Sequence, residues 1–452
     1  MLTDSFIESG FLVAMCICLV TLIMPVFSRE LRQSKSMVVG YWFVVGLHQV
    51  VAFINASIVG TFSHLLDVPL DDRTRIDFSS MGLGTHDSHG FQLWGEKLAM
   101  SEGWRFSLGG GFYKQALGAV YSWFSPSHLL GEQLSILVFA LSCIIFLKIM
   151  RQLGVVRYRL SSLLAFGALP TMVILGSITL RESYQVFFFM LAVYFGVKMH
   201  TKGWPNVYFI ALILSALGMG WFHRALIVYA VFLVLIFVVW SLRPATRLRN
   251  IKKLRLAAFV IIPFLLVGMV VVSRLELREF STFSYLLNQN LLDILSRFRT
   301  GSINLPGRTT YGVPLDPTSS YMMVYSGLKL YVYYLFAPFP WHIGRLIDLY
   351  AGMESIMRMI LIYFSVKQWC NACGTQRRLL GLMLILYFSM TFMWAVGTTS
   401  YGTSMRHHML SWWIIVIVGV PPLMEKLSRL WFRPIVSRLK VMFIRSDQGK
   451  QV

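Results

Sequence analysis

The feature that most constrains the fold is a succession of apolar runs of about 17 to 25 residues, the length that a helix needs to cross a bilayer. These runs follow one another along most of the chain and are separated by polar segments. Hydrophobic residues make up 56% of the 452 residues. Charged residues make up only 13%, about half of the roughly 25% found in a soluble domain. Such a chain lacks the polar surface to cover a globule in water, which argues against a disordered chain, a secreted disulfide scaffold and a cytosolic enzyme.

The apolar runs predict an all-α, polytopic integral membrane protein with about eleven transmembrane helices, organised as a single domain over 1–452. The predicted spans are 11–27, 38–62, 130–149, 160–178, 183–199, 205–221, 224–241, 257–273, 349–366, 379–396 and 409–424. Two shorter stretches rich in Gly, Pro and aromatic residues, 112–125 and 322–338, predict interfacial or re-entrant helices. We expect 11–27 to be retained as an extra N-terminal helix, because no basic region or cleavage site of a signal peptide accompanies it.

The excess of positive charge indicates the orientation of the spans. The formal net charge is +21, and Lys and Arg gather in short cytoplasmic loops of membrane proteins. With the N-terminus outside and the C-terminus in the cytoplasm, the basic segments all fall on the cytoplasmic side. These segments are 28–36, 148–159, 198–204, 242–256, 367–378 and the tail 425–452. Topology therefore accounts for the charge, and nucleic acid is not expected as a partner.

The same orientation places two large polar loops, 63–111 and 274–321, on the outer face. Charged residues at the breaks between spans also fall there. They are Arg181-Glu182, His223-Arg224 and Arg406-His407-His408. Ionisable groups near a bilayer are costly and normally face protein or water, so their gathering predicts one polar cavity that opens outward. The alternative is that some of them are snorkelling anchors or loop ion pairs.

The first outer loop contains an aspartate ahead of apolar residues spaced like one face of a short helix. The simplest interpretation is an amphipathic surface helix capped by Asp87 or Ser88. The functional interpretation is a carboxylate that acts as a base or binds a cation. His86 and His89 flank Asp87, but two histidines and an aspartate on a loop are weak evidence for a metal. The sequence therefore indicates no metal site and no cofactor, and a divalent cation is left open.

The arrangement around Asp87 resembles the C-type membrane glycosyltransferases. The shared features are an outer loop with an aspartate ahead of an amphipathic helix, then a short helix at 113–121 and a further span. The resemblance implies that Asp87 is the catalytic carboxylate. His86 and Ser88 replace the second acid of a paired-acid motif, which is where this chain departs from that family.

Other short motifs are similar to bacterial polysaccharide-assembly membrane proteins. These are Leu169-Pro170 ahead of Leu180-Arg181-Glu182-Ser183, the run Pro338-Phe339-Pro340-Trp341, and Gly397-Thr398-Thr399 ahead of 402–407. The last of these also resembles O-antigen polymerases and ligases, which have outer-face arginines. Together the motifs extend over about 38–424. They imply a multi-pass protein of the bacterial inner membrane.

A polyprenyl-linked sugar donor leaves as a phosphate or pyrophosphate anion, so the developing negative charge must be stabilised. Arginine suits this role because its planar guanidinium holds two phosphate oxygens at once. Arg181 and Arg406 are the first candidates for binding the donor phosphate, and Arg224 and Arg308 are the second. The alternative for the loop arginines is solvated charge or contact with anionic lipids.

The acceptor hydroxyl of the sugar must lose a proton during attack. Asp87 is the first candidate for the base, and His407 or His408 the second.

Three further residues are assigned supporting roles. Glu182 either orients Arg181 or neutralises it at the membrane edge, and His223 lies at the same surface. Trp341 either stacks on a sugar ring or belongs to the aromatic belt of the interface.

The chain is therefore predicted to be a glycosyltransferase or polymerase that assembles a cell-surface polysaccharide from polyprenyl-linked sugars on the outer face of the membrane. The short inner loops leave no soluble domain for a nucleotide sugar. Expected partners are a polyprenyl-linked sugar or oligosaccharide, membrane lipids and other polysaccharide export proteins. Scattered arginines and the histidines favour repeat-unit polymerisation, whereas the loop with Asp87 favours transfer of single sugars. A transporter or flippase is the main alternative, and a receptor or structural protein is another.

Overall fold

The computed structural model describes residues 4–65, 85–101, 111–202, 206–223, 225–241, 299, 309–316, 318–344 and 346–448. Throughout these residues the regular structure is helical, apart from an isolated antiparallel bridge between Thr310 and Ser400. The predicted all-α class is confirmed.

Six helices within the described residues are long and apolar enough to cross a membrane. They are Ser9–Phe27, Lys35–Ala56, His128–Gln152, Asp348–Asn371, Gly374–Gly397 and Tyr401–Leu430. The predicted spans 205–221 and 224–241 form shorter apolar helices, α9 (Asn206–Phe222) and α10 (Ala225–Ser241). The predicted span 257–273 lies outside the described residues. The structure thus supports a membrane protein, while the total of eleven spans stays a prediction.

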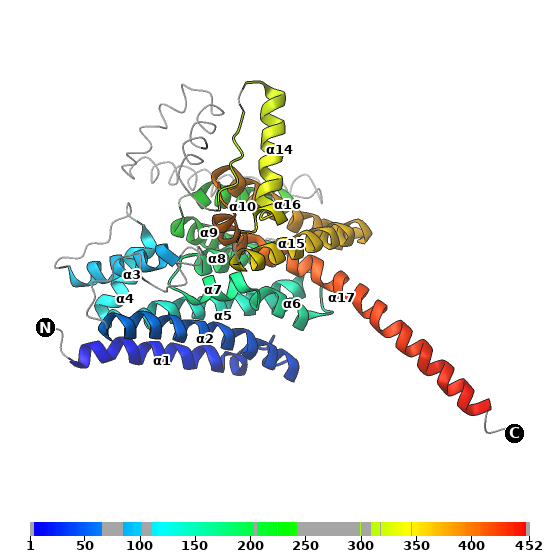
Figure 1. Ribbon diagram of the computed structural model, residues 1–452, viewed down its shortest axis with the longest axis horizontal. Coiled ribbons are helices and arrows are strands. Elements are labelled where there is room, and N and C mark those ends of the chain that lie inside the picture. Colours follow the sequence, from blue (N-terminus) through cyan, green and yellow to red (C-terminus); the bar gives the residue numbers. More distant parts are fainter. Residues whose placement is uncertain are drawn as a thin grey trace.

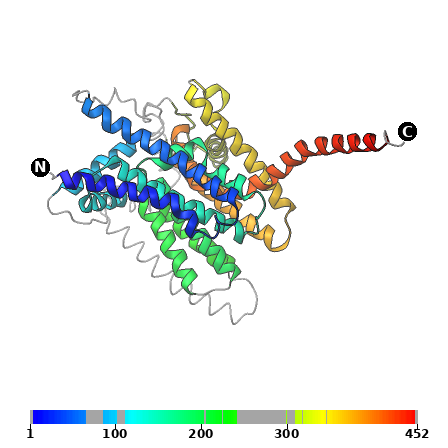
Figure 2. The ribbon, with the colours of Figure 1, turned by 90° about the horizontal axis from the view of Figure 1, so that it is seen from below.

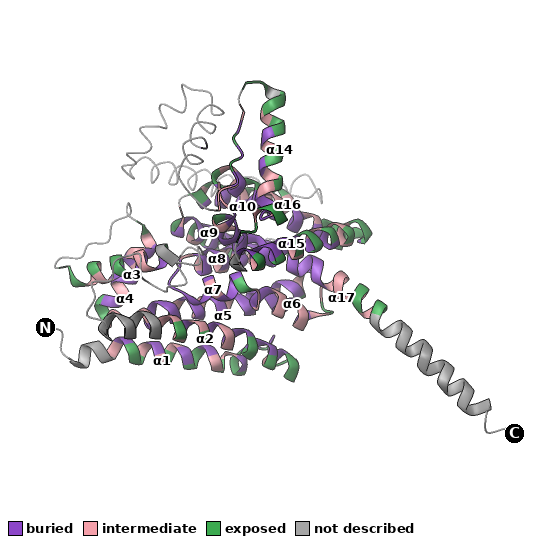
Figure 3. Ribbon diagram, viewed as in Figure 1, coloured by how far each residue is buried: buried purple, intermediate pink, exposed green. Residues whose placement is uncertain are grey.

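The helices pack into a bundle with an apolar exterior. α1 (Asp4–Phe27), α2 (Lys35–Leu65) and α5 (His128–Gln152) lie side by side (Figures 1 and 2). α8 (Glu182–Thr201) packs against α5 and α9, and α15 (Leu346–Asn371) packs against α17 (Tyr401–Gln448). Figure 3 shows exposed residues along the outer faces. Many of them are large and apolar, including Phe11, Leu12, Leu19, Val207, Ile210, Leu214, Ile356, Met359 and Ile360. A continuous apolar exterior of this kind is what lipid covers.

The two ends of the bundle differ in charge. At one end Glu30 accepts ion pairs from Arg151 and, at 2.8 Å, from Arg159. At this end the Tyr158 hydroxyl also lies 3.3 Å from Ser428 Oγ. The predicted basic segments around 28–36 and 148–159 therefore meet there, and we call it the basic end. α5 connects this end to the opposite one: Arg151 lies at the basic end, and Gly131 packs against Thr179, just ahead of α8. The roughly 20 residues between them extend over about 30 Å at a rise of 1.5 Å per residue, which matches the thickness of a bilayer core.

The predicted span 160–178 is a broken helix. α6 (Arg159–Gly167) and α7 (Pro170–Ser177) meet at an angle of 59°. Pro170 explains the break, because proline has no N–H and disfavours helical geometry in the residue before it. The buried carboxylate of Glu354 accepts hydrogen bonds from Thr171 N at 2.8 Å and Thr171 Oγ1 at 2.7 Å, which caps α7. Arg358, which lies one turn after Glu354 on α15, donates to the carbonyl oxygen of Leu335 at 2.7 Å.

Removing the Glu354 cap is expected to destabilise the protein. In Glu354→Ala the buried Thr171 N–H and hydroxyl lose their acceptor, and each unsatisfied group costs about 1–3 kcal/mol. The measurement is the midpoint of thermal unfolding in detergent. Glu425→Ala serves as the control, because it removes a carboxylate from an exposed i,i+4 pair with Arg429 and should change stability by about 0.3–0.5 kcal/mol. Equal midpoints for the two variants would contradict the capping role.

The segment 425–452, predicted as a cytoplasmic tail, is helical as far as the structure describes it. α17 continues without a break to Gln448 and projects from the bundle (Figure 1). Pro421 and Pro422 lie inside this helix where it leaves the bundle. α14 (Ser320–Phe336), which covers most of the predicted re-entrant stretch 322–338, also projects from the bundle in Figure 1.

Candidate functional site

The surface helix predicted within the first outer loop, 63–111, is present as α3 (Thr85–Met100), and it packs on α4 (Phe112–Trp123). α3 begins ahead of the predicted cap, so Asp87 lies in its first turn rather than before it. The side chain of Asp87 is 55% exposed. Its carboxylate accepts a hydrogen bond and ion pair from Arg406. Asp87 is therefore both accessible and held in position by a residue from the last helix.

Arg406 joins two carboxylates from distant parts of the chain. Its guanidinium is 9% exposed, contacts Asp87, and donates from Nε to Glu182 Oε1 at 2.6 Å. Glu182 begins α8 and is buried, and the partial positive charge at a helix N-terminus favours a carboxylate there. Two negative charges thus surround one buried cation.

Arg181 adds a second cation beside this pair. It is the N-cap residue of α8, its Nε lies 3.8 Å from Glu182 Oε1, and its guanidinium lies 5.6 Å from the centre of the Phe91 ring. Burial lowers the pKa of Arg181 from its usual value; Glu182 opposes this shift and Arg406 adds to it. Its side chain is still 28% exposed, so Arg181 is the more accessible of the two arginines.

His407 and His223 both contact the indole ring of Trp394. His407 stacks on Trp394 with ring centres 3.8 Å apart, and its Nδ1 lies 2.9 Å from Thr398 Oγ1. His223 meets the same ring edge-on at 5.1 Å. Burial, together with Arg181 and Arg406, lowers the pKa of His223 to about 3, so its imidazole is neutral at ordinary pH.

Several buried polar atoms around the start of α8 have no hydrogen-bond partner. They are Arg181 Nε, Glu182 Oε2, Ser183 Oγ, Gln185 Nε2 and Trp394 Nε1. Buried polar groups are nearly always paired, so a cluster of unpaired ones is informative. In addition, no side chain caps α8, and a free helix N-terminus attracts anions. The arrangement is suited to a polar, anionic ligand.

Arg299 and Tyr311, from the second predicted outer loop (274–321), form hydrogen bonds to the turn between α16 and α17. Arg299 is buried and donates to the carbonyl oxygens of Val313 at 2.6 Å and Thr398 at 3.0 Å. Tyr311 OH donates to the same Thr398 oxygen at 2.8 Å. These bonds hold the end of α16 (Gly374–Gly397) just ahead of Arg406 and His407.

Ion pairs join four of the predicted site residues that the structure describes: Asp87, Arg181, Glu182 and Arg406. His407 and His223 meet on the ring of Trp394 beside them, where the charges of Arg181 and Arg406 act on His223. The structure does not bring His408 to this group, because the second residue after Arg406 on a helix points about 200° away from it.

His408 faces α14 instead: its Nε2 lies 2.9 Å from the carbonyl oxygen of Tyr334. Trp341 lies in the short helix η2 (Pro340–His342) and is exposed. Its ring stacks on that of Phe339, the residue before η2. Arg224 and Arg308 lie outside the described residues.

Trp394 and Thr398 were not predicted from the sequence. A tryptophan inside an apolar run is typical of helix packing, and nothing in its neighbourhood distinguishes it. The available signal was the spacing of four residues between Trp394 and Thr398, which places both on one face of a helix that ends at the motif 397–399.

Among the described residues, no group of three or more His, Cys, Asp or Glu side chains is placed to hold a metal ion. No family model, curated protein or solved structure matches the chain.

Proposed function

We propose that the protein is a membrane glycosyltransferase or polymerase that assembles a cell-surface polysaccharide from polyprenyl-linked sugars on the outer face of the bacterial inner membrane. The observation that carries the proposal is the buried guanidinium of Arg406 between the carboxylates of Asp87 and Glu182, at the end opposite the basic loops. The two neighbouring arginines and the accessible carboxylate support the proposal, because such a group is suited to a lipid-linked phosphate and a sugar acceptor.

The donor phosphate would bind at the start of α8. Arg181 is partly exposed, and the N–H groups of the first turn of α8 have no side-chain cap. A phosphate that docks here competes with Asp87 for the guanidinium of Arg406. Its departure as a leaving anion is then stabilised by two arginines and a helix N-terminus.

Asp87 would act as the base that accepts the proton of the acceptor hydroxyl. It is the more exposed of the two carboxylates that contact Arg406, and it lies on a surface helix that an extracytoplasmic sugar can reach. Glu182 is buried and is suited to holding Arg406 in position. Trp394 and His407 stack on each other beside this group and are suited to supporting it from within the bundle.

The experiment is elongation by purified protein. The full chain in detergent is given a polyprenyl-linked sugar donor and a matching acceptor, and the product is analysed by mass. A product heavier by one sugar indicates single transfer, and a ladder indicates polymerisation. The absence of any covalent product, together with movement of the lipid-linked donor between leaflets of proteoliposomes, would replace this proposal with a flippase.

The broken helix α6–α7 favours that second candidate, because discontinuous helices are common in transporters.

The proposed orientation predicts opposite labelling of two positions. Ser101 is exposed beside α3, whereas Cys370 and Cys373 are exposed at the basic end. In a Cys16→Ser background, we expect a membrane-impermeant maleimide to label Ser101→Cys on spheroplasts with an intact inner membrane. The two native cysteines should react only after permeabilisation. The reverse pattern would place Asp87 and Arg406 in the cytoplasm and contradict the proposal.

A further inference from the structure

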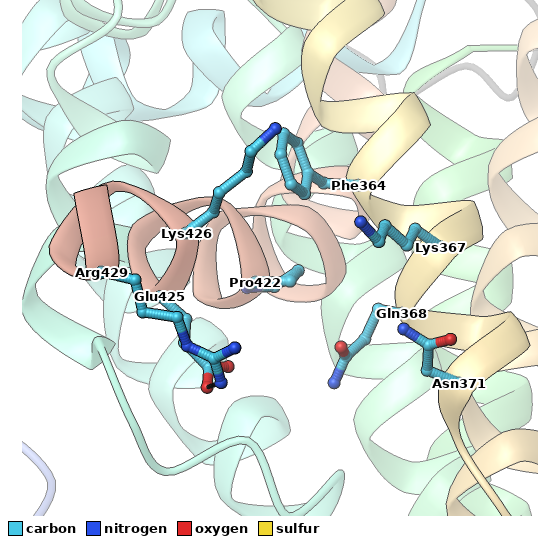
Figure 4. Close-up of a pocket in the computed structure, with 8 residues that line it drawn as sticks. All are labelled: Phe364, Lys367, Gln368, Asn371, Pro422, Glu425, Lys426 and Arg429. Carbon is cyan, nitrogen blue, oxygen red and sulfur yellow. Dashed lines mark hydrogen bonds and ion pairs between the residues drawn. The ribbon is translucent and has the colours of Figure 1, made fainter.

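A second polar site lies at the basic end, between the C-terminal part of α15 and the middle of α17. It is a cavity of about 310 Å³, which is at the lower limit of small-ligand pockets. Figure 4 shows its side chains converging from the two helices. None of them belongs to the group around Arg406.

The shape of the cavity follows from how the two helices approach each other. Near Gly419 the helices are in close contact, since a Cβ at this position would lie 2.5 Å from the carbonyl oxygen of Leu361. Toward the basic end the side chains become longer and polar, and the cavity opens between them. The apolar residues Phe364 and Pro422 line its inner part.

The lining has a positive balance. Lys367, Lys426 and Arg429 contribute three cations, and Glu425 contributes one carboxylate, which pairs with Arg429 at 2.6 Å. Lys426 Nζ lies 5.7 Å from the centre of the Phe364 ring, so a cation stands over the apolar part of the pocket. Lys367 and Lys426 form no ion pair with any residue that the structure describes. Together with the aromatic ring of Phe364 they are complementary to a phosphate attached to an apolar body.

We infer that this pocket binds the phosphate headgroup of an acidic phospholipid. A phosphate could also arrive as a free anion, but two features favour the lipid. The pocket lies where α15 ends, at the level at which headgroups meet the ends of helices of this length. Its floor is apolar, and basic pockets between transmembrane helices are suited to anionic headgroups.

The test is native mass spectrometry of the full chain in detergent with added phosphatidylglycerol or phosphatidylcholine. We expect one phosphatidylglycerol to be retained in preference to phosphatidylcholine. The double variant Lys367→Gln/Lys426→Gln should bind it at least about tenfold more weakly, because each lysine near a headgroup contributes to anion binding. Lys35→Gln/Lys202→Gln is the matched control: it removes two exposed lysines at the same end without touching the pocket and should bind normally.

A variant that binds the lipid more tightly tests the site without relying on a loss that misfolding could also cause. Glu425→Gln removes the one acid of the pocket and frees Arg429, so it should retain phosphatidylglycerol more tightly than the unchanged protein. Equal binding of the two lipids, or no difference between the lysine variants, would overturn the inference. Displacement of the lipid by millimolar glycerol phosphate would assign the pocket to a free phosphate instead.

Discussion

Arg406→Ala is expected to abolish glycan product and also to destabilise the protein. The substitution leaves Glu182 buried without its main counter-charge, and breaking a buried ion pair costs about 3–5 kcal/mol. It also releases Asp87 from α17. The measurements are product formation by purified protein, the amount of protein in the membrane, and thermal unfolding in detergent.

Arg406→Lys separates catalysis from folding. Lysine retains a positive charge near Glu182, but its ammonium cannot contact two carboxylates with the planar geometry of guanidinium. We expect the variant to remain folded and to lose about 10²- to 10³-fold in turnover, the usual effect of removing one stabilising donor. Arg378→Ala, which removes an exposed arginine at the basic end, is the control and should be fully active. Normal turnover in folded Arg406→Lys would eliminate the proposed donor site.

Asp87→Asn is expected to lose about 10²- to 10⁴-fold in turnover, the range attributed to a general base. Asparagine preserves the size of the side chain and can still accept a hydrogen bond from Arg406, but its amide cannot take a proton. Because Asp87 is 55% exposed, the midpoint of thermal unfolding should change little. Turnover is measured at saturating donor so that binding and chemistry are not confused.

Two further variants test whether the carboxylate of Asp87 is required for turnover. Asp87→Glu keeps a carboxylate and should recover part of the lost activity. Glu96→Gln changes another carboxylate on the same helix, one that accepts a hydrogen bond from Gln92 at 2.7 Å, and should leave turnover unchanged. An Asp87→Asn variant with full activity would show that Asp87 only positions Arg406.

The fold class was predictable because lipid imposes a local requirement: each spanning segment must be apolar over its own length. The runs 11–27, 349–366 and 379–396 accordingly lie within apolar helices. The interruption of 160–178 was not predicted, although Pro170 causes it, because a proline is also tolerated inside an unbroken apolar span. The cap of the second half could not be predicted locally, because Glu354 is 183 positions away from Thr171.

The members of the candidate site were predictable one by one, because an ionisable residue beside an apolar run requires an explanation. Their pairing was not. Asp87 and Arg406 are 319 positions apart, and nothing local indicates that their side chains meet. His407 and His408 also illustrate the limit, since adjacent residues of equal chemistry are separated only by the direction in which the helix turns them.

α17 carries Arg406 near its start and continues far beyond the bundle, yet its two halves need not move together. Pro421 and Pro422 lack N–H groups, which leaves the carbonyl oxygens of Ile417 and Val418 without their usual helical donors. Bends in helices are found mostly at interruptions of this kind. A bend of α17 at these prolines would therefore redirect its projecting segment and leave Arg406 in contact with Asp87 and Glu182.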